Sequence, residues 1–306
     1  MKIPDIIVSL DAEWVNANRA DASLPNNENR LLSYQITTLN RRTSATSSAI
    51  IEPNDPTKRG RRGLANLLGL ALRKAVREDV IPDYPDTLAL VIHFSRADLT
   101  HLREWKNICR RVDAVRRTFA TTTKPFVLTV PTTRGSRRIT ITVTDTMLLS
   151  PARMRSLKGL GAALGLPKVR LPPGYSKDRM DLFKRDCPDL FTQYAINDTI
   201  IAARWAQRVW DLLATFFTIR DYVPTLASAA VRMICDLMTH SGLSVDAYFG
   251  YETICRKRQH LACLTEVWTF AANAYHGGRN EAFHLGHSPR HRPLYDGRRR
   301  THSLRA

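Results

Sequence analysis

The sequence is poor in cysteine and has none of the cysteine spacings that bind zinc or build a disulfide framework. No two cysteines form a C-x-x-C pair and their number is odd, so we expect neither kind of site. Reduced thiols are the default in an intracellular protein, and we expect a cytoplasmic or organellar location. The five cysteines are Cys109, Cys187, Cys235, Cys255 and Cys263.

Long apolar runs are absent as well. No stretch of the chain is apolar over the roughly 20 residues that a membrane-spanning helix needs. No basic amphipathic segment has the clean apolar face that would lie on a membrane surface. The chain enters a strand-like segment almost at once, so we expect no secretory signal and no membrane partner.

Acidic residues are outnumbered by basic ones. The chain has 28 Asp and Glu against 46 Lys and Arg, a formal net charge of +18 and a pI near 10.2. So large a surplus favours a polyanionic partner, of which nucleic acid is the commonest; a basic but inert surface is the alternative. Because 43% of the residues are hydrophobic, a substantial core is expected.

Strand and helix patterns are mixed through the first two thirds of the chain. Apolar and β-branched runs predict strands at residues 5–10, 31–39, 47–51 and 87–93, and a hairpin of 126–130 with 138–144. Helical spacing predicts helices at 64–76, 99–105, 156–164 and 188–210, and a polar loop is expected at 16–30. This order predicts an α/β domain, a mixed sheet flanked by helices, that ends near residue 215.

The remainder of the chain has a different character. Pro224 opens a helical region that runs to about residue 274. Residues 287–306 contain six arginines, three histidines and one acid, with almost no apolar pattern. That composition is typical of a disordered basic tail.

Two acids stand at the end of the first predicted strand. Asp11 and Glu13 are separated by one residue, so their carboxylates point to the same face of a strand. Two like charges beside an apolar sheet are costly unless something neutralises them. Mg²⁺ and Mn²⁺ prefer carboxylate oxygens, so the pair indicates a metal site, with a solvated turn as the alternative.

Three later residues are candidates for the same site. Asp98 follows the predicted strand 87–93, where it could bind a metal or cap a helix. Tyr194 and Asp198 are four residues apart and share one helical face. There the aspartate could bind a metal while the tyrosine hydroxyl holds a water. A surface acid beside a core aromatic is the alternative.

The order of these motifs along the chain resembles the tyrosine branch of the DEDD exonucleases. That pattern is a strand ending in D-x-E, then an Asp after a later strand, then Y-x-x-x-D on a late helix. The resemblance implies a ribonuclease H-like fold and two divalent metal ions, Mg or Mn. It implies that the metals activate a water and stabilise the leaving oxygen, so that nucleotides leave one at a time from a 3′ end. The implied metal ligands are Asp11, Glu13, Asp98 and Asp198, and Tyr194 completes the catalytic set by orienting the water.

A second motif narrows the resemblance. AYHGGRNEAF, with Tyr275, Gly277 and Gly278, resembles the Y-x-G-G motif of family B DNA polymerases, in the form found in protein-primed enzymes. In that family the motif follows the exonuclease and helps hand the DNA strand between two active sites. Its glycines let the backbone approach phosphates closely. An ordinary Gly-Gly turn is the alternative. The stretch DYVPTLASAAVRMICDLM resembles the early helical part of such a polymerase, so the resemblance covers about residues 5–286.

The chain also departs from the family pattern. Phe94 stands where the middle motif has Asn, and Ala97 where it has an aromatic; both positions normally contact single-stranded DNA. Lys158 is a candidate for a family lysine that contacts phosphate between the second and third motifs. The implied DNA-binding residues are therefore Phe94, Lys158, Tyr275, Gly277 and Gly278.

The catalytic aspartates of a polymerase are not found after the Y-x-G-G motif. The segment up to Asp296 begins like the approach to the first of them, and GRRRTHSLRA follows. The chain thus resembles a polymerase truncated after this motif. We expect an exonuclease domain over residues 1–215, the incomplete start of a polymerase palm region over 216–286, a tail over 287–306, and no DNA synthesis by this chain alone.

Two functions of different classes stay open. The first is an active exonuclease on single-stranded or frayed 3′ ends of DNA, and the second is a non-catalytic DNA-binding remnant of a polymerase. An RNA-trimming nuclease of the same superfamily is a third, which the Y-x-G-G motif disfavours. The resemblance allows a terminal protein or a separate polymerase fragment as a further partner.

Overall fold

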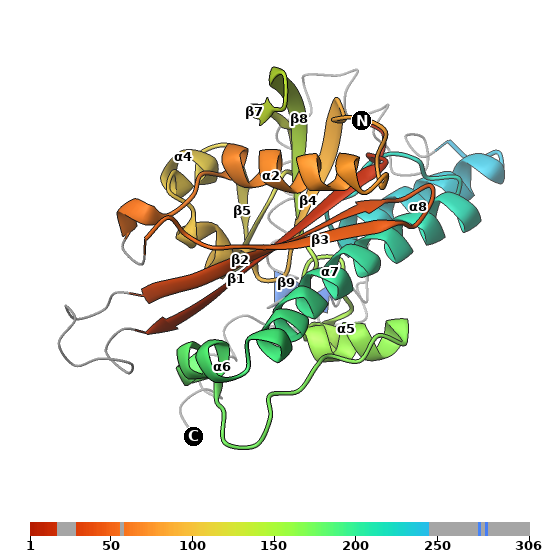
Figure 1. The fold of residues 1–306 in the computed structure, drawn as a ribbon. Helices are drawn as coiled ribbons and strands as arrows, with labels where there is room; N and C mark the ends of the chain where they lie inside the picture. Colours follow the sequence, from red (N-terminus) through yellow and green to blue (C-terminus); the bar gives the residue numbers. More distant parts are fainter. Residues whose placement is uncertain (17–28, 56–57, 245–274, 277–278, 281–306) are drawn as a thin grey trace, which may run out of the picture. The chain divides into compact units, whose positions relative to one another are not determined.

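The computed structural model describes residues 1–16, 29–55, 58–244, 275–276 and 279–280. Its centre is a six-stranded sheet in the order β3-β2-β1-β4-β8-β7 (Figure 1). β1 pairs antiparallel with β2 and parallel with β4, and β4 pairs parallel with β8. β3 and β7 add antiparallel edges. This mixed sheet with its flanking helices confirms the predicted α/β class and the ribonuclease H-like arrangement.

Most strands extend beyond the patterns that predicted them, whereas β4 ends one residue before the predicted 87–93. They are β1 (Ile6–Asn16), β2 (Asn29–Asn40), β3 (Thr46–Ile51), β4 (Thr87–Ile92), β7 (Phe126–Thr132) and β8 (Gly135–Asp145). The apolar pattern of β1 stops at Leu10, but hydrogen bonding to β2 carries the strand six residues further. Asp11 and Glu13 therefore lie within the central strand, opposite Gln35 and Ser33 of β2, rather than in a turn after it.

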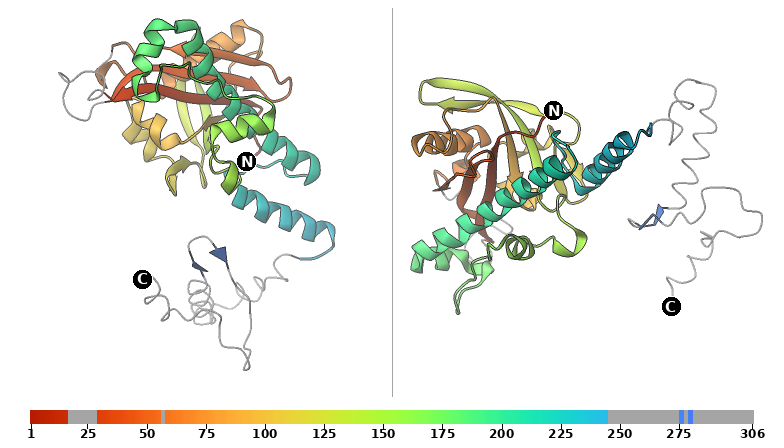
Figure 2. Two further views of the ribbon diagram at one scale, coloured as in Figure 1. Left: turned by 90° about the horizontal axis from the view of Figure 1, so that it is seen from below. Right: turned by 90° about the vertical axis from the view of Figure 1, so that its right-hand side faces the viewer.

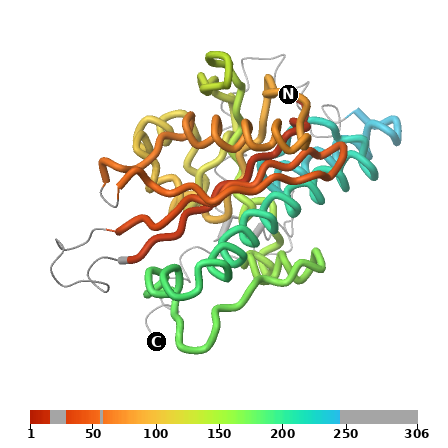
Figure 3. The backbone as a smooth tube through the Cα atoms, viewed as in Figure 1, coloured from red at the N-terminus to blue at the C-terminus, as the bar shows by residue number. Residues whose placement is uncertain are grey.

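Two hydrophobic cores sandwich the sheet. α2 (Leu64–Arg77) covers one face, and the long α7 (Pro188–Phe216) crosses the other, as Figures 2 and 3 show. Successive side chains of β1 point to opposite faces of the sheet and so contribute to both cores. Val8 and Leu10 belong to the core on the α2 side, and Ile7 belongs to the core that contains Trp210 of α7. α5 (Leu157–Leu164) and α6 (Met180–Asp186) lie along α7.

The connection from β4 to β7 differs from its prediction. The single helix predicted for residues 99–105 is wrong, because Leu102 is extended and interrupts it. Instead the chain forms α3 (Ser95–Asp98), the 3₁₀ turn η2 (Leu99–His101), α4 (Trp105–Cys109) and a small hairpin of β5 (Asp113–Val115) and β6 (Thr118–Ala120). Leu99 and Leu102 are both fully buried, so tertiary packing overrides helical spacing here. Further 3₁₀ turns are η1 (Lys58–Gly60), η3 (Ala152–Met154) and η4 (Lys177–Arg179).

The chain divides into two compact units, residues 1–237 and 238–306. In the first unit, packing continues past residue 215, because Ile219, Val223 and Ala229 join the core around Trp210. α8 (Leu226–His240) begins in this segment. The second unit contains a two-stranded ribbon of β9 (Tyr275–His276) and β10 (Arg279–Asn280). The predicted tail 287–306 lies outside the described residues. Within the described residues, no helix has the length and apolarity to cross a membrane.

A close helix–strand contact generates a test of this packing. A Cβ atom at Gly69 of α2 would lie 2.7 Å from the carbonyl oxygen of Pro131 in β7. Gly69→Ala gains about 1 kcal/mol of helix propensity, but forcing the backbones apart costs about 1–3 kcal/mol. We expect the variant to be destabilised by up to about 2 kcal/mol in urea unfolding. Arg73→Ala, at an exposed position of the same helix, should stay within about 0.5 kcal/mol. A more stable Gly69→Ala protein would contradict the packing.

Candidate active site

The site is built on β1, a central strand that pairs with β2 on one side and with β4 on the other. Asp11 and Glu13 project from one face of it, while Ala12 and Trp14 between and after them pack into the α2-side core. Hydrogen bonding to β2 along this stretch fixes the backbone, and the register shifts only after Glu13. Two carboxylates are thereby held side by side on the α7 face of the sheet.

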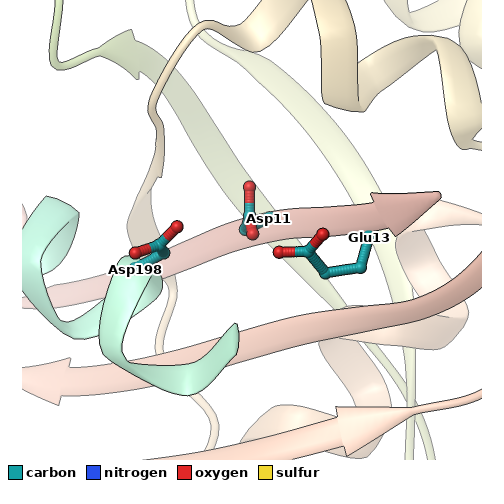
Figure 4. Close-up of side chains that lie close together, drawn as sticks. All are labelled: Asp11, Glu13 and Asp198. Carbon is teal, nitrogen blue, oxygen red and sulfur yellow. The ribbon is translucent and has the colours of Figure 1, made fainter. Parts of the chain in front are cut away.

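Asp198 of α7 brings a third carboxylate to the same place. Oxygen atoms of Asp11, Glu13 and Asp198 all lie within 4.8 Å of one another, and Figure 4 shows the three groups turned toward a common point. The neighbour of Asp198, Thr199, fixes the helix to the sheet by a buried 2.7 Å hydrogen bond with Thr37 of β2. Asp198 is only 9% exposed, whereas Asp11 and Glu13 are half-buried.

The crowded carboxylates resist ionisation. Burial, together with the charge of Asp198, raises the pKa of Asp11 to about 7, although the nearby Lys168 opposes the shift. Burial and the charges of Asp11 and Asp198 hold the pKa of Glu13 well above its usual value. Burial also raises the pKa of Asp198, against the effect of Lys168. Like charges this close indicate a place where a cation would be favourable.

Asp98 lies beside the cluster but is not one of the three carboxylates within 4.8 Å. It is the last residue of α3, is buried, and makes no side-chain capping bond to η2. Burial and the charges of Asp11 and Glu13 raise its pKa well above the usual value, opposed by a hydrogen bond from the Ala12 backbone. These interactions place Asp98 next to β1.

Tyr194 stands one turn before Asp198 on α7 and is buried. Burial is the main cause of its raised pKa, and the charges of Glu13, Asp198 and Asp11 raise the pKa further. Its hydroxyl therefore keeps its proton and can both donate and accept a hydrogen bond. The ring packs edge-on against Phe183 of α6, which fixes its orientation.

The structure adds Lys168, which the sequence patterns did not single out. Its ammonium forms an ion pair with Asp198 and lies 5.0 Å from the centre of the Tyr194 ring. Asn197 holds this loop in place, because its side-chain oxygen accepts a hydrogen bond from the Val169 backbone. The predicted Lys158 instead lies on the exposed side of α5. The sequence has six lysines between the second and third motifs, and its patterns gave no reason to choose Lys168 among them.

The loop after β4 completes the surroundings. Phe94 is 40% exposed and adopts a left-handed backbone (φ 63°), which is unusual for an aromatic residue. The buried carboxylate of Asp145 accepts hydrogen bonds from the backbone N–H groups of Phe94 and Ser95 and so holds this turn. His93 pairs with Thr146 at 2.7 Å, and burial together with Lys168 lowers its pKa to about 4, so its ring is neutral.

The Y-x-G-G residues are described only in part. Tyr275 and His276 form β9 and pair with Asn280 and Arg279 of β10. Gly277 and Gly278 lie outside the described residues.

The residues present fit divalent cations. One oxygen of Asp198, Oδ1, is buried and has no hydrogen-bond partner among the described residues, and the Asp198 carboxylate lies close to those of Asp11 and Glu13 (Figure 4). Carboxylate oxygens are the donors that Mg²⁺ and Mn²⁺ prefer. A free, buried acceptor beside two more carboxylates has the donor chemistry of such a site.

Comparison with known proteins gives one distant relative. No protein-family model matches the chain. The primer-independent DNA polymerase PolB of Escherichia coli is 25% identical over 293 residues, which cover 86% of this chain and 34% of that protein. The chain is thus a distant homologue of this polymerase and spans about a third of its length.

Among solved structures, two nucleases are similar at low scores. A full-length 3′-exonuclease is 11% identical with a TM-score of 0.34, covering 68% of this chain and 61% of its own. The nuclease domain of 3′hExo, a DEDDh family member bound to rAMP, is 11% identical with a TM-score of 0.32. The match covers 72% of this chain and 98% of that domain.

The raised carboxylate pKa values predict an unusual pH dependence of stability. Folded Asp11 keeps its proton to about pH 7, whereas an unfolded Asp loses it near pH 4. Between these values the folded state binds more protons, so the free energy of unfolding falls as pH rises. Because Asp11 is half-buried, we expect a loss of about 1–2 kcal/mol between pH 4 and pH 8 in EDTA. Thermal unfolding of the protein and of Asp11→Asn measures it; the variant should lose less stability over this range, because Asp11 no longer titrates while Glu13, Asp98 and Asp198 still do.

The same experiment with Mg²⁺ or Mn²⁺ tests the metal fit. Cations bind the ionised carboxylates, so the metal should raise the melting temperature more at pH 8 than at pH 5. An equal effect at both pH values, or an unchanged effect in Asp11→Asn, would contradict binding at this cluster.

Proposed function

We propose that the chain is a metal-dependent 3′→5′ DNA exonuclease whose catalytic residues are Asp11, Glu13, Asp98, Tyr194 and Asp198. The observation that carries the proposal is the convergence of Asp11, Glu13 and Asp198 within 4.8 Å, next to a protonated tyrosine. Hydrolysis of a phosphodiester at neutral pH is the reaction for which such a carboxylate group is suited.

The four aspartate and glutamate side chains would hold the metal ions. When bound, divalent cations supply an acidified water and neutralise charge on the scissile phosphate and the leaving 3′ oxygen. Asp11, Glu13 and Asp198 form the core of the ligand set, with Asp98 beside it. The rigid central strand and the anchored α7 keep these carboxylates in place before substrate arrives, so little reorganisation is needed.

Tyr194 orients the attacking water in this proposal. Its hydroxyl stays protonated because burial and three nearby carboxylates oppose ionisation. A neutral phenol cannot act as a strong base at neutral pH, so its contribution is one of position. The edge contact with Phe183 fixes the ring, which would keep the hydroxyl near the carboxylates.

Lys168 supplies a positive charge on the side of Asp198. Its ammonium offsets the carboxylates and lies where a scissile phosphate would add further negative charge. A flexible lysine can keep its contact with Asp198 or turn to a phosphate oxygen, since its three N–H groups donate independently. We therefore assign Lys168, rather than Lys158, as the lysine that holds the phosphate.

DNA is favoured as the substrate on two grounds. The distant relative is a DNA polymerase, and the chain carries a net charge of +18, which favours a polyanion. We propose single-stranded or frayed 3′ ends as the substrate, with Phe94 contacting the strand beside the carboxylates. Residues 1–215 would carry this activity, and the Y-x-G-G segment with Tyr275, Gly277 and Gly278 would contact DNA from the 216–286 region of a protein-primed polymerase.

The first test removes the metal ligands on β1. Asp11→Ala with Glu13→Ala should lower degradation of a 5′-labelled single strand at least 10³-fold, a loss on the order of 4 kcal/mol of transition-state stabilisation, because no ion can be held. EDTA should have the same effect on the unaltered protein. DNA binding, measured by fluorescence anisotropy, should persist in the variant. Binding without any hydrolysis by the unaltered protein would favour a non-catalytic DNA-binding remnant instead.

The second test compares the two lysines. Lys168→Met should lower kcat by about 10–100-fold, because a charge next to the reacting phosphate is lost. Lys158→Met removes the same charge from the exposed side of α5 and should change kcat less than twofold. Equal effects of the two substitutions would refute the assignment of Lys168.

A further inference from the structure

A polar cavity lies away from the carboxylates, between α2 and the turn that joins β7 to β8. Its volume is about 620 Å³. Three arginines line it, Arg73 of α2 with Arg134 and Arg137 of the hairpin. The hydroxyls of Thr132, Thr133 and Ser136 stand beside them. We call this the arginine cleft.

The positive charge of the cleft is only partly neutralised. Asp83 is its one acidic lining residue, and it binds Arg137 at 2.9 Å. Asp86 binds the same guanidinium at 2.8 Å. Both acids are largely exposed (71% and 83%), so these pairs are weak and mainly orient Arg137. Arg73 and Arg134 form no ion pair within the part of the chain that the structure describes, so both are available to a ligand.

The walls of the cleft are rigid and contain an unused polar group. α2, which carries Arg73, packs closely on β7 through Gly69, and Arg134 and Arg137 follow β7 in the turn and in β8. Tyr84 also lines the cleft, is only 5% exposed, and its buried hydroxyl has no hydrogen-bond partner among the described residues. A buried hydroxyl without a partner is uncommon in a folded protein, and here it belongs to a residue that lines the cleft.

The cleft is distinct from the carboxylate site. β8 connects the two, because Ser136 lies at the cleft and Asp145, nine residues later, holds the Phe94 turn. At about 3.3 Å per residue this separates them by about 30 Å. Because the cleft lies on the α2 side of the sheet and the carboxylates lie on the α7 side, a strand that contacts both has to pass round the sheet. That path takes at least the roughly nine nucleotides that a stacked strand needs to cover about 30 Å at a rise of about 3.4 Å each.

We propose that the arginine cleft is a second nucleic-acid contact, which binds backbone phosphates of the substrate strand upstream of its 3′ end. Guanidinium groups match phosphate oxygens in pairs, and hydroxyls add single hydrogen bonds. No exposed aromatic lines the cleft for base stacking, so the contact is independent of sequence. The identity of the bound strand rests on the proposed exonuclease function, but the phosphate chemistry of the cleft does not.

Binding in EDTA isolates the cleft from hydrolysis. Arg73→Ala with Arg134→Ala should weaken binding of a labelled 20-nucleotide oligothymidylate about tenfold at 0.1 M salt. The slope of log K against log salt should become smaller by about 1.4, because each lost single-strand phosphate contact contributes about 0.7. The control is Arg208→Ala with Arg220→Ala, which removes the same charge from exposed positions elsewhere and should leave the slope unchanged. Equal effects of the two double variants would overturn the proposal.

Kinetics then separate the cleft from the carboxylates. For the cleft variant, KM for the 20-mer should rise about tenfold, whereas kcat and the KM for a 5-mer, too short to reach the cleft, should not change. A matching rise for the 5-mer would overturn the proposal. Competition with free deoxynucleoside triphosphate gives a further test. If the triphosphate displaces the 20-mer and this displacement requires Arg73 and Arg134, the cleft is a nucleotide site and the proposal is overturned. A protein that binds the 20-mer through these arginines but degrades nothing would refute only the exonuclease.

Discussion

Repulsion among three carboxylates is the interaction around which the rest of the structure is arranged. Asp11, Glu13 and Asp198 approach within 4.8 Å although none is fully exposed to water, and each has a raised pKa. Such an arrangement costs folding free energy and persists only where the surroundings determine it. The scaffold provides this through a central strand bonded on both sides and two separate cores that clamp it.

The chain supplies part of the compensation itself. Lys168 pairs with Asp198 and lowers the pKa of all three carboxylates relative to burial alone. Asn197 holds the Lys168 loop, so neighbouring residues on one turn of α7 position both an acid and its counter-charge. The uncommitted Oδ1 of Asp198 shows that this compensation is incomplete. A site that a lysine neutralises in part keeps negative charge that would favour a cation.

Positive side chains lie at two places, one next to the carboxylates and one far from them. Next to the carboxylates, Lys168 is the positive group, and Asp145 holds the backbone of Phe94 at the edge of the site. At the far end of β8, the arginine cleft has positive charge without a buried acid. One strand thus connects the two places. A net charge of +18 describes neither, since it reports the amount of charge and not its position.

Much of this protein follows from its sequence alone, because local spacing determines which side chains share a face. The D-x-E spacing puts Asp11 and Glu13 on one side of any strand, and the four-residue spacing puts Tyr194 above Asp198 on any helix. The class of fold follows for the same reason. What tertiary structure decided are the contacts between segments far apart in the chain. Pairing with β2 extended β1 through both acids, burial of Leu99 and Leu102 broke the helix predicted there, and the packing of the loop after α5 brought Lys168, not Lys158, to Asp198. Periodicity carries no information on such contacts, since they depend on which surfaces meet when the chain packs.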